Sequence, residues 1–171
     1  MRLTTTIAPA PADFDRWPEV LELLRDAFAY MADRIDPPSS MNRLDLDGLR
    51  AKAGREIALI AWQGDEIVGC AFLDPRPDCL YVGKVAVTAQ ARGQGLARQF
   101  FEQAEAMAHE RGLAYLELQT RVELLENHET FRRLGFVKTG EDAHAGYRRP
   151  TSITMRRPTK PALRPHRPVP D

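Results

Sequence analysis

Cysteine and histidine are scarce in this sequence of 171 residues, which contains two cysteines and four histidines. Cys70 and Cys79 both lie inside apolar runs and lack the CxxC spacing of many redox and zinc sites. The histidines are scattered, with no spacing typical of a metal site. We therefore predict that the protein binds no metal and that both thiols remain reduced, as is usual in the cytoplasm.

Long hydrophobic runs and an excess of one charge are also missing. No apolar run approaches the roughly 20 residues of a membrane-spanning helix, and the opening stretch MRLTTTIAPAPAD contains no apolar signal core. Lysine and arginine together number 24, as do aspartate and glutamate. A balanced charge creates no global field that would recruit nucleic acid or a membrane. We therefore expect a cytoplasmic protein without membrane or nucleic-acid partners.

Two common nucleotide-binding motifs are absent as well. The dinucleotide fingerprint GxGxxG would require glycine or alanine at position 98, which is Arg98 here. The P-loop requires Gly-Lys followed by Ser or Thr, and no such string occurs in the chain. The sequence therefore excludes these two phosphate-binding motifs.

What the sequence does contain is a strand, a glycine loop and a helix within residues 80–111. An apolar, β-branched run at 80–87 predicts the strand, and apolar residues after Gly95 recur at helical spacing. Gly93 and Gly95 let the backbone approach a ligand closely, and the first N–H groups of the helix point into the same space. The helix end adds about half a positive charge and Arg92 adds a full one, which favours a phosphate or pyrophosphate. A plain strand-to-helix turn is the alternative.

The chain length favours one domain, because 171 residues can form one sizeable core but not two ordinary ones. We assign residues 1–157 to this domain. From Pro158 onward, prolines are interleaved with basic residues. This stretch has little apolar area to offset the cost of ordering its backbone, about 1–2 kcal/mol per residue. We therefore predict that residues 158–171 form a disordered tail.

Local patterns predict a sheet that begins antiparallel and continues with a parallel strand after the long helix. The predicted strands lie at 3–7, 57–62, 67–73, 80–87, 114–120, 136–138 and 152–155. The predicted helices lie at 17–31, 44–54, 96–111 and 123–134. Together they indicate a mixed sheet with helices on both faces.

Two motifs together resemble the GNAT superfamily of N-acetyltransferases. Q-x-x-G-x-G, formed by Gln90, Gly93 and Gly95 after a strand, is similar to the acyl-CoA pyrophosphate loop of that family. ENHETFRRLGF, at 126–136, is similar to its second cofactor-side helix and Leu-Gly-Phe exit. The resemblance covers residues 2–157. It implies an α/β (α+β) fold with a mixed, mostly antiparallel central sheet of six to seven strands, acetyl-CoA as acyl donor and a primary amine as acceptor.

The resemblance also assigns residues to acetyl-CoA. By this analogy, the strand contacts the acyl-pantetheine chain, the glycine loop and helix start surround the pyrophosphate, and two residues of the later helix flank the thioester. For Asn127, a helix N-cap is an equally weighted alternative. The implied cofactor residues are Val85, Ala86, Val87, Gln90, Arg92, Gly93, Gln94, Gly95, Leu96, Ala97, Asn127 and Phe131.

The implied reaction is direct attack of an amine on the acyl-CoA thioester. It requires a neutral amine, a donor to the developing oxyanion and a proton for the departing thiolate. A backbone N–H near Val85 is the implied oxyanion donor. Glu117, on the parallel strand, is a candidate catalytic base, with an ion-pair or surface role as the alternative.

The sequence departs from the resembled family where the thiolate is protonated. Many members have a tyrosine at the position of Phe131, and a phenyl ring cannot donate a proton. Tyr147, His128 and water remain as proton sources, and Tyr147 is the favoured catalytic acid. Without a clear acid and base, an acyl-CoA-binding module without turnover is the alternative function.

Substrate recognition falls, by resemblance, to residues 30–40 and 144–148. Polar side chains in these segments can hold an amine or a carboxylate, and a hydrated loop is the alternative for any one of them. The candidate substrate residues are Tyr30, Asp36, Ser39 and His144. The choice of amine and a homodimer both remain open.

Overall fold

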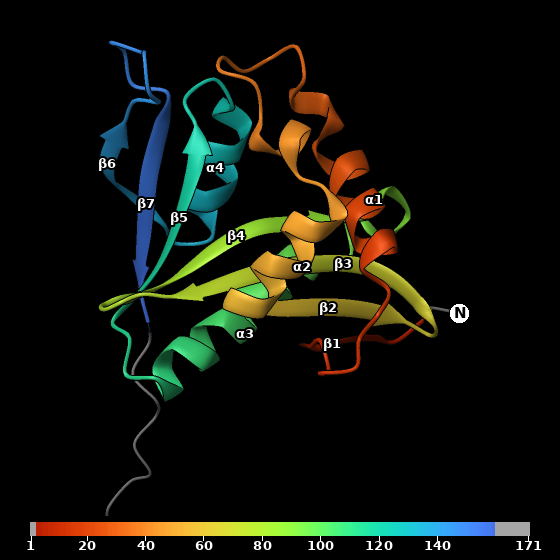
Figure 1. Cartoon of the computed structure of the whole chain (residues 1–171). Coiled ribbons are helices and arrows are strands. Elements are labelled where there is room, and N and C mark those ends of the chain that lie inside the picture. Colours follow the sequence, from red (N-terminus) through yellow and green to blue (C-terminus); the bar gives the residue numbers. More distant parts are fainter. Residues whose placement is uncertain (1–2, 160–171) are drawn as a thin grey trace, which may run out of the picture.

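The computed structural model describes residues 3–159 (Figure 1). The strands are β1 (Thr5–Pro9), β2 (Ile57–Gln63), β3 (Glu66–Pro75), β4 (Cys79–Val87), β5 (Tyr115–Arg121), β6 (Val137–Asp142) and β7 (Ser152–Pro158). The helices are α1 (Trp17–Phe28), α2 (Leu46–Arg55), α3 (Leu96–Glu110) and α4 (Leu125–Arg133), with 3-10 turns η1 (Ala29–Met31), η2 (Ser40–Arg43) and η3 (Ala89–Ala91). No helix in this part of the chain is long and apolar enough to cross a membrane.

The seven strands form one sheet in the order β1-β2-β3-β4-β5-β7-β6. Neighbouring strands are antiparallel, except for the parallel pair β4 and β5. The helices α1 and α2 pack on one face of the sheet, and α3 and α4 pack on the other. The predicted fold class, a mixed and mostly antiparallel sheet with helices on both faces, is therefore confirmed.

Two apolar cores hold the helices against the sheet. In the first, Phe100 of α3 shares a buried cluster with Leu116 of β5. In the second, Leu24 of α1 and Leu49 of α2 cluster with Phe72 of β3. All five side chains are fully buried, and each such burial is worth about 1.5–3 kcal/mol. The first core fixes the start of α3 close to the end of β4.

A bulge interrupts β4 in the middle of the sheet. The register with β3 shifts between Cys70 and Phe72, so that Lys84 and Val85 together oppose Ala71. Lys84 has a φ of 50° and is the only non-glycine residue with positive φ in the described chain. Such a conformation is uncommon outside glycine, asparagine and aspartate.

The bulge changes which side chains of β4 face each core. Before it, Leu80 and Val82 belong to the core beneath α3. After it, Val85 and Val87 pack against that same core, whereas Ala86 joins the core beneath α1. Because side chains alternate along a strand, this inserted residue resets which faces they occupy. Val85 is thereby directed to the α3 side of the sheet.

The parallel strands β4 and β5 pair only near their starts, over Cys79–Tyr81 and Tyr115–Glu117. Beyond these residues they separate, and Figure 1 shows β5, β7 and β6 turning away from the rest of the sheet. The β4 bulge, the glycine loop after β4 and the start of α4 all lie beyond this point in the chain. The opening between the two strands therefore brings together the segments that carry the sequence motifs.

Strand β7 continues past the predicted boundary at residue 157. Pro158, assigned to the tail from sequence, is the last residue of β7 and pairs with Tyr115. The N–H of Thr159 donates to the carbonyl oxygen of Ala114 at 2.9 Å. These contacts move the predicted boundary by two residues, because β7 continues along β5 despite the prolines. The rest of the predicted tail, 160–171, lies outside the described residues.

Substitution of Gly69 should test how tightly β3 packs beneath the bulged strand. A Cβ at Gly69 would lie 2.9 Å from the carbonyl oxygen of Ala86 and 3.1 Å from the Phe100 ring. We expect Gly69→Ala to lower the free energy of unfolding by about 1–3 kcal/mol, because this overpacking forces the backbone to shift. Gly140→Ala in β6 is the matched control, since a Cβ there meets nothing within 4 Å. Equal urea midpoints for the two variants would contradict the prediction.

Candidate functional site

The opening between β4 and β5 is a cleft of about 450 Å³. On one side it is lined by Ala97 and Phe101 of α3 and Phe131 of α4. On the other side it is lined by Ser40 of η2 and Lys52 of α2. The cleft therefore passes between the two faces of the sheet, so that two ligands can approach one point from opposite sides.

A second hollow, of about 400 Å³, extends from the cleft along the end of β4. Phe28, Tyr30 and Val85 line both spaces, and the second hollow also includes Val87 and Arg92. Together the two hollows connect the predicted acyl-chain strand with the glycine loop. An extended ligand can thus lie along β4 with its anionic end at Arg92.

The glycine loop has the geometry expected of an anion site. Gly93 and Gly95 have φ values of 78° and 77°, and a Cβ added to either would meet nothing within 4 Å. Helix α3 starts at Leu96, so the N–H groups of its first turn have no partner within the helix. The Gln94 side chain steadies the loop by accepting a hydrogen bond from Gln63 at 2.7 Å. A pyrophosphate fits this open and electropositive corner.

The predicted thioester-flanking residues both line the cleft from α4. Asn127 donates from Nδ2 to the hydroxyl of Tyr30 at 3.3 Å, which joins α4 to η1. The N-cap alternative for Asn127 is wrong, because α4 starts at Leu125 with Leu124 in the cap position. The structure therefore leaves its amide on the cleft wall.

Phe131 presents only an aromatic ring to the cleft. Its ring packs edge-on against Phe101 and Phe136, with centroids 6.1 and 6.2 Å away. His128 is nearby in sequence but buried, with Nε2 2.8 Å from the carbonyl oxygen of Arg121. His128 is not among the residues that line the cleft. Neither residue is therefore placed to protonate a thiolate there.

Three of the four predicted substrate residues, Tyr30, Ser39 and His144, line the cleft. Burial lowers the pKa of the His144 imidazole, and the charge of Arg121 lowers it further, which favours the neutral ring. Asp36, the fourth predicted residue, is not part of the lining. The structure thus brings residues from distant loops together but leaves Asp36 outside.

Asp36 instead connects two loops at the edge of the site. Its carboxylate accepts a hydrogen bond from the hydroxyl of Tyr147 and forms a 3.3 Å salt bridge with Arg149. Its backbone N–H donates to Glu123 at 2.7 Å. The hydrogen bond to Asp36 raises the pKa of Tyr147, which also lies outside the cleft lining. A role for Tyr147 as catalytic acid would require this bond to break.

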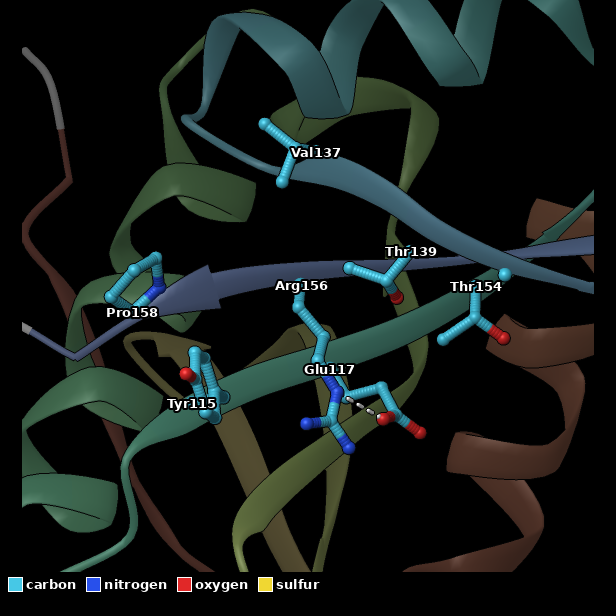
Figure 2. A pocket seen from close by; sticks show the side chains of 8 residues that line it. Tyr115, Glu117, Val137, Thr139, Thr154, Arg156 and Pro158 are labelled. Atoms are coloured by element: carbon cyan, nitrogen blue, oxygen red, sulfur yellow. Dashed lines mark hydrogen bonds and ion pairs between the residues drawn. The ribbon is translucent and has the colours of Figure 1, made fainter.

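Glu117 lies away from the position that the sequence suggested. It pairs with Tyr81, at the closed end of the opening, and lines a different hollow of about 520 Å³ on the β5-β7-β6 part of the sheet. Figure 2 shows its carboxylate directed toward Arg156, whose Nε donates to it at 2.7 Å. Arg76 donates to the same carboxylate at 3.2 Å. This geometry supports the ion-pair alternative and not a catalytic base beside Val85.

Positive charges on the cleft wall were missed by the sequence reasoning. Lys52, Lys84 and Arg121 line the cleft, whereas no aspartate or glutamate of residues 3–159 does so. Lys84 had a signal in the sequence, since it interrupts the apolar strand immediately before Val85. No signal in the sequence marks Lys52 or Arg121, because only the folded chain brings α2 and the end of β5 to the same space.

No metal centre is apparent among residues 3–159, where no three His, Cys, Asp or Glu side chains come together in a suitable cluster. The absence of a metal stays a prediction. Both cysteines are buried and unpaired, and burial raises the pKa of Cys70 to about 12 and that of Cys79 to about 11. Their thiols are therefore protonated near neutral pH and belong to the core.

The sheet thus parts around a cleft, with a glycine loop at one end. The model of the family described as "Acetyltransferase (GNAT) family" matches residues 17–136. The chain belongs to this family, and the resemblance drawn from its two motifs is confirmed.

Solved structures share the fold over nearly the whole chain. The ribosomal-protein-S18-alanine N-acetyltransferase from Escherichia coli has a TM-score of 0.69 at 19% identity, covering 93% of this chain and 96% of that one. A GNAT family acetyltransferase from Elizabethkingia anophelis with acetyl-CoA bound has a TM-score of 0.67 at 19% identity, covering 90% and 97%. At identities this low, the similarity of the structures shows a common fold and nothing more.

A curated relative matches part of the sequence more closely. The L-2,4-diaminobutyric acid acetyltransferase of Methylotuvimicrobium alcaliphilum is 39% identical over 69 residues, which form 39% of this chain and 40% of that protein. The chain thus matches about two fifths of the length of this relative.

Neutralising Glu117 should separate a structural role from a catalytic one. Its side chain is 9% exposed, and Glu117→Gln leaves Arg76 and Arg156 with a weaker acceptor. We expect a loss of about 1–3 kcal/mol in the free energy of unfolding, measured by urea denaturation, with kcat for acetyl transfer unchanged. Glu129→Gln, which removes exposed pairs on α4, should cost less than about 1 kcal/mol. A fall in kcat of about a hundredfold without loss of stability would instead support a base.

Proposed function

We propose that this protein is an N-acetyltransferase that moves an acetyl group from acetyl-CoA to a primary amine of a small molecule or peptide by direct attack. The observation that carries the proposal is the bulge of β4, which lies in the cleft at the point where the two hollows meet. Family membership supports it, and so does the acetyl-CoA held by one structural neighbour.

The residues present suit the parts of acetyl-CoA. The first turn of α3 and Arg92 supply donors and positive charge for the pyrophosphate. Val85, Ala86 and Val87 lie along the hollow that leads from this loop to the cleft, which suits the pantetheine arm. Asn127 and Phe131 line the cleft beyond, where the thioester belongs. Acetyl-CoA supplies an activated acetyl group when it binds.

The reaction requires few groups from the protein. The neutral amine nitrogen attacks the carbonyl carbon, a C–N bond forms, the C–S bond breaks, and the sulfur leaves as a thiolate. The N–H of Val85 donates to the developing oxyanion, because the bulge takes this stretch out of the regular ladder. The attacking nitrogen loses one proton to water and the thiolate takes one from water, since Phe131 has no donor and Tyr147 is bound to Asp36.

A small acceptor is favoured by the partial match to the diaminobutyrate enzyme, whose name specifies a compact molecule with primary amines. The cytoplasmic location, a homodimer and a single domain remain predictions that accompany this proposal.

An acyl-CoA-binding module without turnover is the second candidate, favoured by Phe131 and by a cleft without carboxylates among residues 3–159. Release of free CoA, measured with a thiol reagent while a panel of primary amines is added, separates the two. We expect release that depends on both amine and enzyme concentration. Tight acetyl-CoA binding with no amine-dependent release would favour the binding module.

The glycine loop can be tested by placing a carboxylate in it. A hundredfold excess of acetyl-CoA over its Kd should stabilise the protein by about 2.7 kcal/mol, or roughly 5 to 10 °C in Tm. Gly95→Asp should abolish this shift, because its carboxylate repels the pyrophosphate. Gly64→Asp is the matched control, since Gly64 also has a positive φ of 60° and open space around it but lies in the β2–β3 turn. An unchanged shift in folded Gly95→Asp would place the cofactor elsewhere.

A further inference from the structure

Lys84 brings a positive charge to the wall of the cleft. Its Nζ lies 3.4 Å from the hydroxyl of Ser40, and no carboxylate of the described chain forms a salt bridge with it. The side chain is half-buried, and burial lowers the pKa of Lys84, with the lowering by Lys52 opposed by the charge of Glu56. A partly desolvated cation is costly to hold unless an anion pairs with it. The cleft therefore favours a ligand that supplies negative charge.

The backbone around Lys84 argues for a role of its side chain. Lys84 occupies the left-handed region with a φ of 50°, where glycine would fit without strain. Strained residues that persist beside a cleft are often functional. Lys84 also immediately precedes Val85, the proposed oxyanion donor, so its side chain starts next to the reacting carbonyl.

The charges around Lys84 point to the acceptor as the source of the anion. Lys52 is already bound to Glu56 at 2.6 Å, and this pair adds little net charge. Arg121 is held by backbone carbonyls, at 2.6 Å from Pro37, and adds a further cation to the wall. The phosphates of acetyl-CoA belong at Arg92, at the far end of the second hollow. They therefore do not neutralise the charge at Lys84.

We propose that Lys84 binds a carboxylate of the acceptor, so that the acceptor is a small amino acid carrying both a primary amine and a carboxylate. This inference rests on the proposed acetyl transfer. The ammonium of Lys84 and the hydroxyl of Ser40 donate to the carboxylate, and Arg121 extends the cationic wall. Polyamines and lysine-rich peptides meet like charges in this cleft and are disfavoured.

The test compares amino acids with their carboxamides, which keep the amine and lose the negative charge. Glycine, β-alanine and γ-aminobutyrate, their carboxamides, and spermidine are assayed for CoA release and for calorimetric binding to the CoA-saturated protein. At least one acid should bind about tenfold or more tightly than its amide. Lys84→Met should raise the acid's KM and Kd by a similar factor while the acetyl-CoA-induced Tm shift stays unchanged. Lys84→Arg should restore the preference for the acid.

Lys138→Met is the control, because Lys138 is an exposed lysine of β6 paired with Glu141. Equal binding of acids and amides, or a preference that survives in Lys84→Met, overturns the inference even if amines release CoA. If no acceptor releases CoA but an acid binds about tenfold more tightly to the wild type than to Lys84→Met, the proposed turnover fails and the carboxylate site stands. The experiment therefore distinguishes failure of the carboxylate site from failure of the proposed acetyl transfer.

Discussion

The bulge in β4 is the constraint on which the whole site depends. A regular strand would continue the side-chain alternation set by Leu80 and Val82, and would place Val85 on the other face of the sheet. The extra residue prevents this and holds Lys84 in a left-handed conformation. The apolar cores on both faces fix the strand on each side of the distortion. Packing thus maintains an irregularity that an isolated strand would not keep.

Electrostatics divide the site into two ends. Arg92 and the start of α3 provide positive charge at one end, and Lys84 and Arg121 provide it at the other. Carboxylates near the site are engaged in contacts outside the cleft, such as Glu117 with two arginines and Asp36 with Tyr147. The cleft itself is lined by no carboxylate of residues 3–159, which suits a thioester arm meeting an anionic acceptor.

Membership of the GNAT family explains why β4, the glycine loop and α4 occur together, since in this family they form one site for an acyl-CoA. Solved structures share this fold at identities near 19%. In this chain the cleft is lined by Phe131 and by the cations Lys84 and Arg121. Specificity therefore has to be sought in side chains that the shared fold leaves free to vary.

The sequence by itself determined the order of elements, the glycine loop and the family, because these depend on local periodicity and on residues adjacent in the chain. It also placed Asn127 and Phe131 on a helix, and both line the cleft in the structure. Only the tertiary structure showed that Glu117 is an ion-pair residue and that Tyr147 is bound to Asp36. Local patterns do not reveal which side chains from distant segments meet, or where β4 and β5 part. Those outcomes were decided by register and by packing across the sheet.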